Sequence, residues 1–211
     1  MENELVIVGT GSGEPDQIIP EAYEAIREAE ILIGSERLLR NFAWEEQVTY
    51  KISGDLRSLK LNITAWQERK VVVLVSGDPG FFSILDWIRR EFPELRLRVI
   101  PGISSMQLAF ARAARSWFDC KFLSLHGRSN QGLVEEVNNH SKVCILTDSN
   151  NSPTDLLKGL KQAGICSKWV FIGSNLGTSR EVIWEGSLND LNGAPNDPYS
   201  VVIMEDEKMA L

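Results

Sequence analysis

Short apolar runs alternate along the chain with stretches in which apolar residues recur every three or four positions. Runs bounded by glycine or proline are typical of strands buried on both faces of a parallel sheet, and the periodic stretches are typical of helices that cover such a sheet. The alternation therefore predicts an α/β fold. Strands are predicted at residues 5–8, 31–33, 70–75, 97–100, 122–125, 143–146, 169–172 and 199–204, and helices at 18–29, 81–92, 104–113 and 152–164.

The clearest boundary follows the run VVVLV at residues 71–75. The chain breaks into SGDPG at 76–80, and the apolar residues from Phe81 to Phe92 then recur at helical spacing. The break therefore lies at the carboxyl end of a strand, which is where ligands bind in open α/β sheets. A tight turn in which Asp78 caps the following helix is the alternative.

Other glycine-containing loops also follow predicted strands. Glycine in such loops permits turns with positive φ and lets the backbone approach a ligand closely. If the strands are parallel, these loops line one crevice. The loops are GTGSG at 9–13, PGISS at 101–105, SLHGR at 124–128 and GSNLGTSRE at 173–181.

The organisation suggests two domains. The chain has 211 residues, which is long for one doubly wound domain and comfortable for two. Trp117 and Phe118 interrupt the helical pattern near 112–119, so we expect α/β domains at 1–114 and 118–211. The last predicted strand follows Pro195 and Pro198, which favours an edge or closing position because proline donates no ladder hydrogen bond.

Charge and cysteine content narrow the function. The formal net charge is −7 and the pI is near 5.0, which argues against a general nucleic-acid binder. Three separated cysteines and two histidines form no ligand cluster, so neither a metal site nor a disulfide framework is expected. No window approaches a membrane span and no signal peptide is evident, so we expect a soluble, cytoplasmic protein.

Two nucleotide-binding patterns compare poorly with the chain. GTGSG resembles the start of the dinucleotide fingerprint, but Glu14 stands where its third glycine belongs and Pro15 follows. A carboxylate there is unfavourable for a pyrophosphate. The Walker pattern is absent, since no Gly-Lys-Ser/Thr occurs.

Taken in order, the loops resemble those of the tetrapyrrole methylases, the class III S-adenosylmethionine (SAM) methyltransferases. The resemblance covers essentially the whole chain. It is carried by IVGTGSGEPDQI, AEILIGSERLL, VSGDPGFFSI, VIPGISSMQLAFAR, FLSLHGR and GSNLGTSRE.

The resemblance implies two α/β domains with SAM in the cleft between them, and a homodimer. VIPGISS and SLHGR resemble the branch that methylates C5 of a cobalt-precorrin, or of the corresponding precorrin, in cobalamin biosynthesis. Larger members carry an additional decarboxylating C15-methyltransferase domain, so a separate protein of that activity is a potential partner. The linker around Arg115 departs from the pattern of the branch. We expect this departure to alter the hinge between the domains more than the chemistry.

The resemblance also implies where the ligands bind. For SAM it implies Ser12, Gly77, Asp78, Phe81, Ser104, Ser105, Thr147, Asn175, Leu176, Gly177 and Ser200, with Thr147 and Ser200 matched only by strand order. A carboxylate-rich tetrapyrrole requires a local basic region, and arginine grips carboxylates in bidentate fashion. Arg128 and then Arg115 are the candidates, with Gly11 on the cleft floor. His126 is the candidate base, with a solvated or core histidine as its alternative.

Three other functions stay open from the sequence. One is a SAM methylase of the same fold that acts on another tetrapyrrole. Another is a non-catalytic binder of SAM or tetrapyrrole. The third is a dinucleotide-dependent oxidoreductase, which the departures at Glu14 and Pro15 disfavour.

Overall fold

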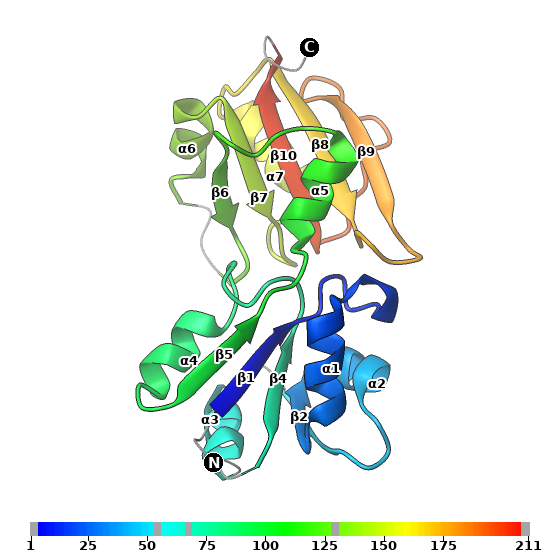
Figure 1. Cartoon of the computed structure of the whole chain (residues 1–211). Helices are drawn as coiled ribbons and strands as arrows, with labels where there is room; N and C mark the ends of the chain where they lie inside the picture. Colours follow the sequence, from blue (N-terminus) through cyan, green and yellow to red (C-terminus); the bar gives the residue numbers. More distant parts are fainter. Residues whose placement is uncertain (1–3, 53–55, 66–68, 128–130, 208–211) are drawn as a thin grey trace. The chain divides into compact units, whose positions relative to one another are not determined.

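The computed structural model describes residues 4–52, 56–65, 69–127 and 131–207. The chain divides into two compact units, unit 1 ending at Ser104 and unit 2 beginning at Ser105. Each unit has a five-stranded sheet with helices on its faces (Figure 1). The predicted α/β fold class is therefore confirmed, and the predicted domain limits of 1–114 and 118–211 stay a prediction.

The sheet of unit 1 is parallel throughout, in the order β3-β2-β4-β1-β5. Gly9 pairs with Val75 and Val8 pairs with Ile100, so β1, β4 and β5 end side by side. This register brings the loops at 9–13, 76–80 and 101–105 to one edge. The strands are β1 (Glu4–Gly9), β2 (Ile31–Gly34), β3 (Val48–Lys51), β4 (Val71–Val75) and β5 (Arg96–Ile100).

Helices cover both faces of this sheet. One core cluster contains Ile26 of α1 and Leu38 of α2, and the other contains Ile63 of α3 and Ile88 of α4. Both faces of β2 and β4 are consequently buried, as expected for a parallel sheet. The bounds are η1 (Pro15–Gln17, a 3₁₀ turn), α1 (Pro20–Glu28), α2 (Glu36–Phe42), α3 (Leu56–Ala65) and α4 (Leu85–Glu91).

Two helices of unit 1 begin later than predicted. α1 starts at Pro20, after the turn η1, because proline suits the first helical position. α4 starts at Leu85 rather than at Phe81. Phe82 has a φ of 49°, in the left-handed region, and a helix cannot run through that conformation.

The sheet of unit 2 is mixed, in the order β6-β7-β10-β8-β9. β6 and β7 are parallel, β10 is antiparallel to both β7 and β8, and β9 is antiparallel to β8. β10 is therefore a central strand, so the edge position, one of the two alternatives predicted for it, is wrong. Val201 to Met204 are buried on both faces, since helices cover both sides of the sheet there. The strands are β6 (Lys121–Ser124), β7 (Lys142–Leu146), β8 (Lys168–Ser174), β9 (Val182–Ser187) and β10 (Ser200–Asp206).

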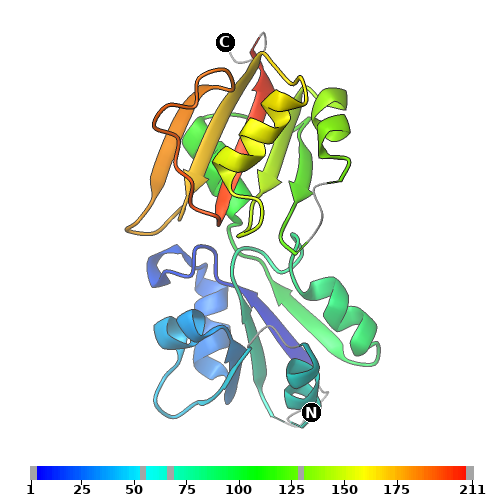
Figure 2. The ribbon, with the colours of Figure 1, turned by 180° about the vertical axis from the view of Figure 1, so that it is seen from behind.

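The helices of unit 2 also cover both faces. α5 packs on β10 and β8, while Val137 of α6 and Leu157 of α7 share a core cluster with Ile145 and Val202. Figure 2 shows α7 lying across the sheet face opposite α5. The bounds are α5 (Ser105–Ala113), α6 (Leu133–Asn139) and α7 (Pro153–Gln162). None of the helices in the described ranges is long and apolar enough to cross a bilayer.

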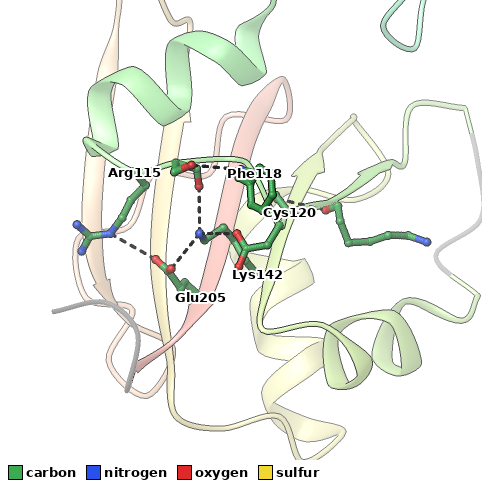
Figure 3. A network of polar contacts seen from close by, with 8 residues as sticks. Arg115, Phe118, Cys120, Lys142 and Glu205 are labelled. Carbon is green, nitrogen blue, oxygen red and sulfur yellow. Dashed lines mark hydrogen bonds and ion pairs between the residues drawn. The ribbon is translucent and has the colours of Figure 1, made fainter.

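A charge cluster around the buried pair of Lys142 and Glu205 lies where β7 begins and β10 ends (Figure 3). Lys142 Nζ is 3.2 Å from Glu205 Oε1 and 3.0 Å from Asp119 Oδ1, and it donates to the carbonyl oxygen of Ser116 at 3.0 Å. Arg115 Nε is 3.3 Å from Glu205 Oε2. The cluster attaches residues 115–119 to the sheet. Burial lowers the pKa of Lys142, but the bonds to Asp119 and Glu205 outweigh it and raise that pKa overall.

The three cysteines differ in accessibility, which predicts a simple labelling pattern. Cys144 is buried, Cys120 is half-buried and Cys166 is exposed. Burial raises the pKa of the Cys120 thiol to about 12, so it stays protonated and unreactive near neutral pH. We expect a disulfide reagent at pH 8 to modify Cys166 rapidly in the native protein, and all three thiols in denaturant. Rapid modification of Cys166→Ser would contradict this arrangement.

Candidate functional site

Three glycines bring the strand-end loops of unit 1 into backbone contact. A Cβ atom on Gly102 would lie 2.3 Å from the carbonyl oxygen of Gly77 and 2.6 Å from the carbonyl carbon of Gly9. A Cβ atom on Gly9 would lie 2.5 Å from the backbone nitrogen of Gly102. Real contacts of this kind are never so short, so only glycine fits at Gly9 and Gly102.

The loops after β1 and β4 are also hydrogen-bonded to each other. Gly77 N donates to Gly11 O at 2.7 Å, and Gly11 N donates to Gly77 O at 3.3 Å. Both glycines have positive φ, at 58° for Gly11 and 68° for Gly77. The resemblance assigned Gly77 to the cofactor and Gly11 to the substrate, and the structure places them side by side.

Asp78 joins the loop after β4 to the loop after β5. Its Oδ1 accepts a hydrogen bond from Gly80 N at 2.8 Å, and its Oδ2 accepts one from Gly102 N at 3.3 Å. The alternative in which Asp78 caps a helix is wrong, because α4 begins at Leu85 with Ile84 as its N-cap. Asp78 therefore holds the geometry of two loops at once.

The remaining candidates of unit 1 lie around these loops. Arg37 Nη1 of α2 donates to Ser12 O at 2.7 Å, so α2 helps to hold the loop that follows β1. Ser104 is buried, and its Cα would be 3.6 Å from a Cβ on Gly77. Phe81 contacts Phe82 edge to face, with ring centroids 4.8 Å apart.

Thr147 and Ser200, the two weaker matches, contact each other directly. Thr147 N donates to Ser200 O, and Ser200 N donates to Thr147 Oγ1, both at 3.0 Å. Thr147 Oγ1 also donates to Pro198 O at 2.7 Å. These contacts lie where β7 ends and β10 begins. Both side chains are buried, so their hydroxyl groups hold the strand ends together.

The loop after β8 lies at the same edge of the sheet. Ser174 Oγ is 2.7 Å from Ser200 Oγ, and Asn175 Nδ2 donates to Asp197 Oδ2 at 3.1 Å. Asp197 Oδ1 in turn accepts from Tyr199 N at 2.9 Å. Leu176 is buried, and its side chain lies over Gly173, where a Cβ would be 2.8 Å from it. The structure thus brings the unit 2 candidates at 147, 175–177 and 200 together.

His126 is exposed at the end of β6, on the same edge. Its ring centroid is 6.4 Å from that of Tyr199. Gly127 N donates to Asp148 Oδ2 at 3.0 Å, so the backbone next to His126 is fixed by a carboxylate that follows β7. The side chain of Asn151 and the backbone N–H of Gly127 lower the pKa of Asp148, which favours its ionised form.

Three candidates remain. Arg115 lies at the opposite end of the unit 2 sheet, paired with Glu205 and stacked over Trp169 at 4.9 Å from the ring centroid. Ser105 is the first residue of α5. Arg128 lies outside the described residues.

Sequence reasoning missed three carboxylates that hold these loops, Asp148, Asp197 and Glu181. Their partners are 21, 22 and 4 residues away, at Gly127, Asn175 and Gly177. Only the position of Asp148 and Glu181 in or beside a strand-end loop offered a signal. Among the described residues, no group of His, Cys, Asp and Glu side chains is arranged to hold a metal ion.

Comparison with known proteins identifies the family. Residues 4–192 match the model of the tetrapyrrole (corrin/porphyrin) methylases. The chain is 32% identical over 202 residues to a cobalt-precorrin-7 C(5)-methyltransferase of Salmonella typhimurium, covering 96% of this chain and 99% of that one. It is also 28% identical to a longer Sinorhizobium enzyme, a decarboxylating precorrin-6Y C(5,15)-methyltransferase. That match covers 84% of this chain and 43% of the longer one.

A solved structure shows the same fold. Uroporphyrin-III C-methyltransferase from Thermus thermophilus, in complex with S-adenosylhomocysteine, has a TM-score of 0.76 at 16% identity, and the match covers 99% of this chain and 100% of that one. The family resemblance predicted from the loops is confirmed. The chain belongs to the tetrapyrrole (corrin/porphyrin) methylase family.

Proposed function

We propose that this methyltransferase transfers a methyl group from SAM to C5 of cobalt-precorrin-7, or of the corresponding cobalt-free precorrin, in cobalamin (vitamin B12) biosynthesis. The observation that carries the proposal is the 32% identity to the Salmonella enzyme of that activity, which extends over almost the full length of both chains. The strand-end loops support it, because most of the residues that the resemblance assigned to SAM lie in loops at one edge of the sheet within each unit.

The residues at these strand ends fit a nucleoside cofactor with a charged amino-acid tail. Gly11, Gly77 and Gly177 all have positive φ, so the loops present backbone groups without side-chain bulk. The hydroxyl groups of Thr147 and Ser200 already bond within the protein. We therefore assign the contacts with SAM chiefly to loop backbone, and assign Thr147 and Ser200 to holding that backbone in place.

The reaction requires the protein to align SAM with the tetrapyrrole more than it requires a nucleophile from the protein. SAM supplies an activated methyl group on a sulfonium. A ring carbon of a reduced tetrapyrrole is electron-rich, so the chain's task is to hold the reacting groups in line at attack distance. His126, exposed beside Tyr199, is proposed to accept the proton released at C5, with Asp148 holding its loop.

For the substrate, the acidic chain needs local positive charge. Arg128 is the proposed carboxylate contact, with Gly11 beside the macrocycle, and Arg115 is the second proposal although it lies at the opposite end of the unit 2 sheet from His126. The ion pair of Arg115 with Glu205 gives this side chain a second role within unit 2. Arg128 is thus the stronger of the two candidates for substrate binding.

A single-turnover reaction tests the function. The protein is mixed with isotopically labelled SAM and cobalt-precorrin-7, and the macrocycle is analysed by mass spectrometry, with NMR to place the label. One added methyl at C5 is the expected product. Binding of S-adenosylhomocysteine is measured in the same sample. Binding without transfer would point to another tetrapyrrole or a non-catalytic binder, and absence of binding would contradict the proposal.

Asp78→Ala should weaken S-adenosylhomocysteine binding about tenfold, because it removes two hydrogen bonds to a charged acceptor that hold neighbouring loops. Asp78→Asn should have an intermediate effect, since its amide oxygen can keep one of the two bonds. Titration calorimetry measures both. Asp86→Ala, at an exposed position on α4, is the matched control and should bind as the wild type. Equal affinity in Asp78→Ala would remove Asp78 from the site.

Three wider expectations are also proposals. The homodimer implied by the family resemblance can be measured by light scattering. A separate decarboxylating C15-methyltransferase is a proposed partner, because the Sinorhizobium relative is longer than this chain and its name includes a C15 activity. A cytoplasmic location is proposed because the three cysteines are free thiols.

A further inference from the structure

A carboxylate downstream of the loop at 175–177 binds the backbone of that loop. Glu181 Oε2 accepts a hydrogen bond from Gly177 N at 2.6 Å. The same carboxylate pairs with Arg112 of α5, with Nε to Oε1 at 2.7 Å and Nη2 to Oε2 at 3.3 Å. We propose that Glu181, held by Arg112, is a positioning residue that fixes the loop at 175–177 in the conformation that binds SAM. This inference rests on the proposed function.

The loop needs such an anchor because its backbone is unusual. Asn175 has a φ of 51° and Gly177 a φ of 75°, so two of three consecutive residues are left-handed. Asparagine enters the left-handed region more readily than other non-glycine residues do, and local hydrogen bonds then hold it there. Thr178 supplies one such contact, since its N–H and its hydroxyl both donate to Asn175 O. Glu181 supplies the contact on the other side, at Gly177.

Arg112 makes Glu181 a better acceptor. The hydrogen bond from Arg112 is the main cause that lowers the pKa of the Glu181 carboxyl, and the bond from Gly177 N lowers that pKa further. Burial acts in the opposite direction but is outweighed. An ionised carboxylate forms shorter and stronger bonds to N–H donors than a neutral group does. Because the side chains of Arg112 and Glu181 are 40% and 21% exposed, the pair contributes little to stability. Its main effect is therefore on the geometry of the loop.

The pair also connects two segments that the proposed function assigns to SAM. Arg112 lies in the last turn of α5, and α5 begins at Ser105. Glu181 lies four residues after Gly177 and immediately before β9. The ion pair thus fixes the loop relative to the helix within unit 2.

Affinity for S-adenosylhomocysteine, measured by titration calorimetry, tests the role, together with KM for SAM and kcat. Glu181→Ala should raise the dissociation constant and KM about tenfold while kcat and the melting temperature stay near the wild-type values. Glu181→Gln keeps an acceptor for Gly177 N and should recover much of the affinity. Arg112→Met should resemble Glu181→Gln. Glu185→Ala, at an exposed position on β9, is the control.

The outcomes separate the two proposals. If wild-type protein binds S-adenosylhomocysteine and Glu181→Ala binds it equally well, the positioning role is overturned and the function stands. A lower melting temperature with unchanged affinity in the correctly folded fraction would also overturn it, since that result indicates a purely structural role. If wild-type protein does not bind at all, the proposed function itself fails.

Discussion

Replacing Gly102 with alanine should destabilise unit 1 by about 3 kcal/mol, because an added methyl group must displace backbone rather than a flexible side chain. The Cβ would meet the carbonyl groups of both Gly77 and Gly9, at 2.3 and 2.6 Å. Those atoms belong to two other strand-end loops, so the strain reaches all three. We expect S-adenosylhomocysteine binding to fall below detection. Urea unfolding and calorimetry measure the two effects.

Gly159→Ala is the matched control for this substitution. Gly159 lies inside α7, and a Cβ there would meet no atom within 4 Å. Alanine is favoured over glycine in a helix interior by about 0.8 kcal/mol, so this variant should be more stable than the wild type. Wild-type affinity in Gly102→Ala would show that the loops can move apart and would contradict the proposed backbone contact.

Lys142→Met should have the other large effect, a loss of about 3 kcal/mol, because it removes the ammonium group beside the buried carboxylate of Glu205 and leaves Arg115 as its remaining cation. Glu205 is 3% exposed, so water cannot replace the ammonium group. The double variant Lys142→Met/Glu205→Gln should recover part of the loss, since no buried charge then stays uncompensated. Lys158→Met, at an exposed position on α7, should change stability by less than about 0.5 kcal/mol.

The pH dependence of unfolding provides a second measurement on this cluster. The pKa of Lys142 is raised in the folded state, so its stabilisation is complete below the ordinary value of 10.5 and is lost as the pH rises through the higher folded value. The Lys142 bond lowers the pKa of Asp119, whose contribution is instead lost at acid pH. Lys142→Met should remove the alkaline dependence and reduce the acid one, since a backbone hydrogen bond also lowers the pKa of Asp119. If its stability follows the same pH profile as that of the wild type, the cluster does not act as described.

Local pattern predicted eight of the ten strands in the described residues and missed β3 and β9. The end of the strand at VVVLV can be predicted without tertiary information, because the apolar run and the glycines of SGDPG together mark it. The central position of β10 could not be read in this way, because Pro195 and Pro198 favour an edge and strand order depends on contacts distant in sequence. The start of α4 was missed because the left-handed φ of Phe82 has no signature in a phenylalanine.

The candidate site shows the same difference between residues that local sequence predicts and residues whose partners are distant in sequence. Glycines and Asp78 were found because they occupy strand-end loops. Asp148 and Asp197 were missed because each binds a residue more than 20 positions away, at Gly127 and Asn175. Arg115 was selected for its charge, and a sequence cannot show that Glu205, 90 residues later, lies beside it.

The strand order of unit 2 has a consequence for biosynthesis on the ribosome. Unit 1 has all five strands once Ile100 has been made, so it can fold while the rest of the chain is still being translated. In unit 2 the middle of the sheet is β10, which follows every other strand in sequence. Until β10 leaves the exit tunnel, β7 and β8 have no partner between them and present open edges. The nascent second half must therefore wait for its last strand, and during that wait it is the part of the molecule most exposed to aggregation and to chaperones.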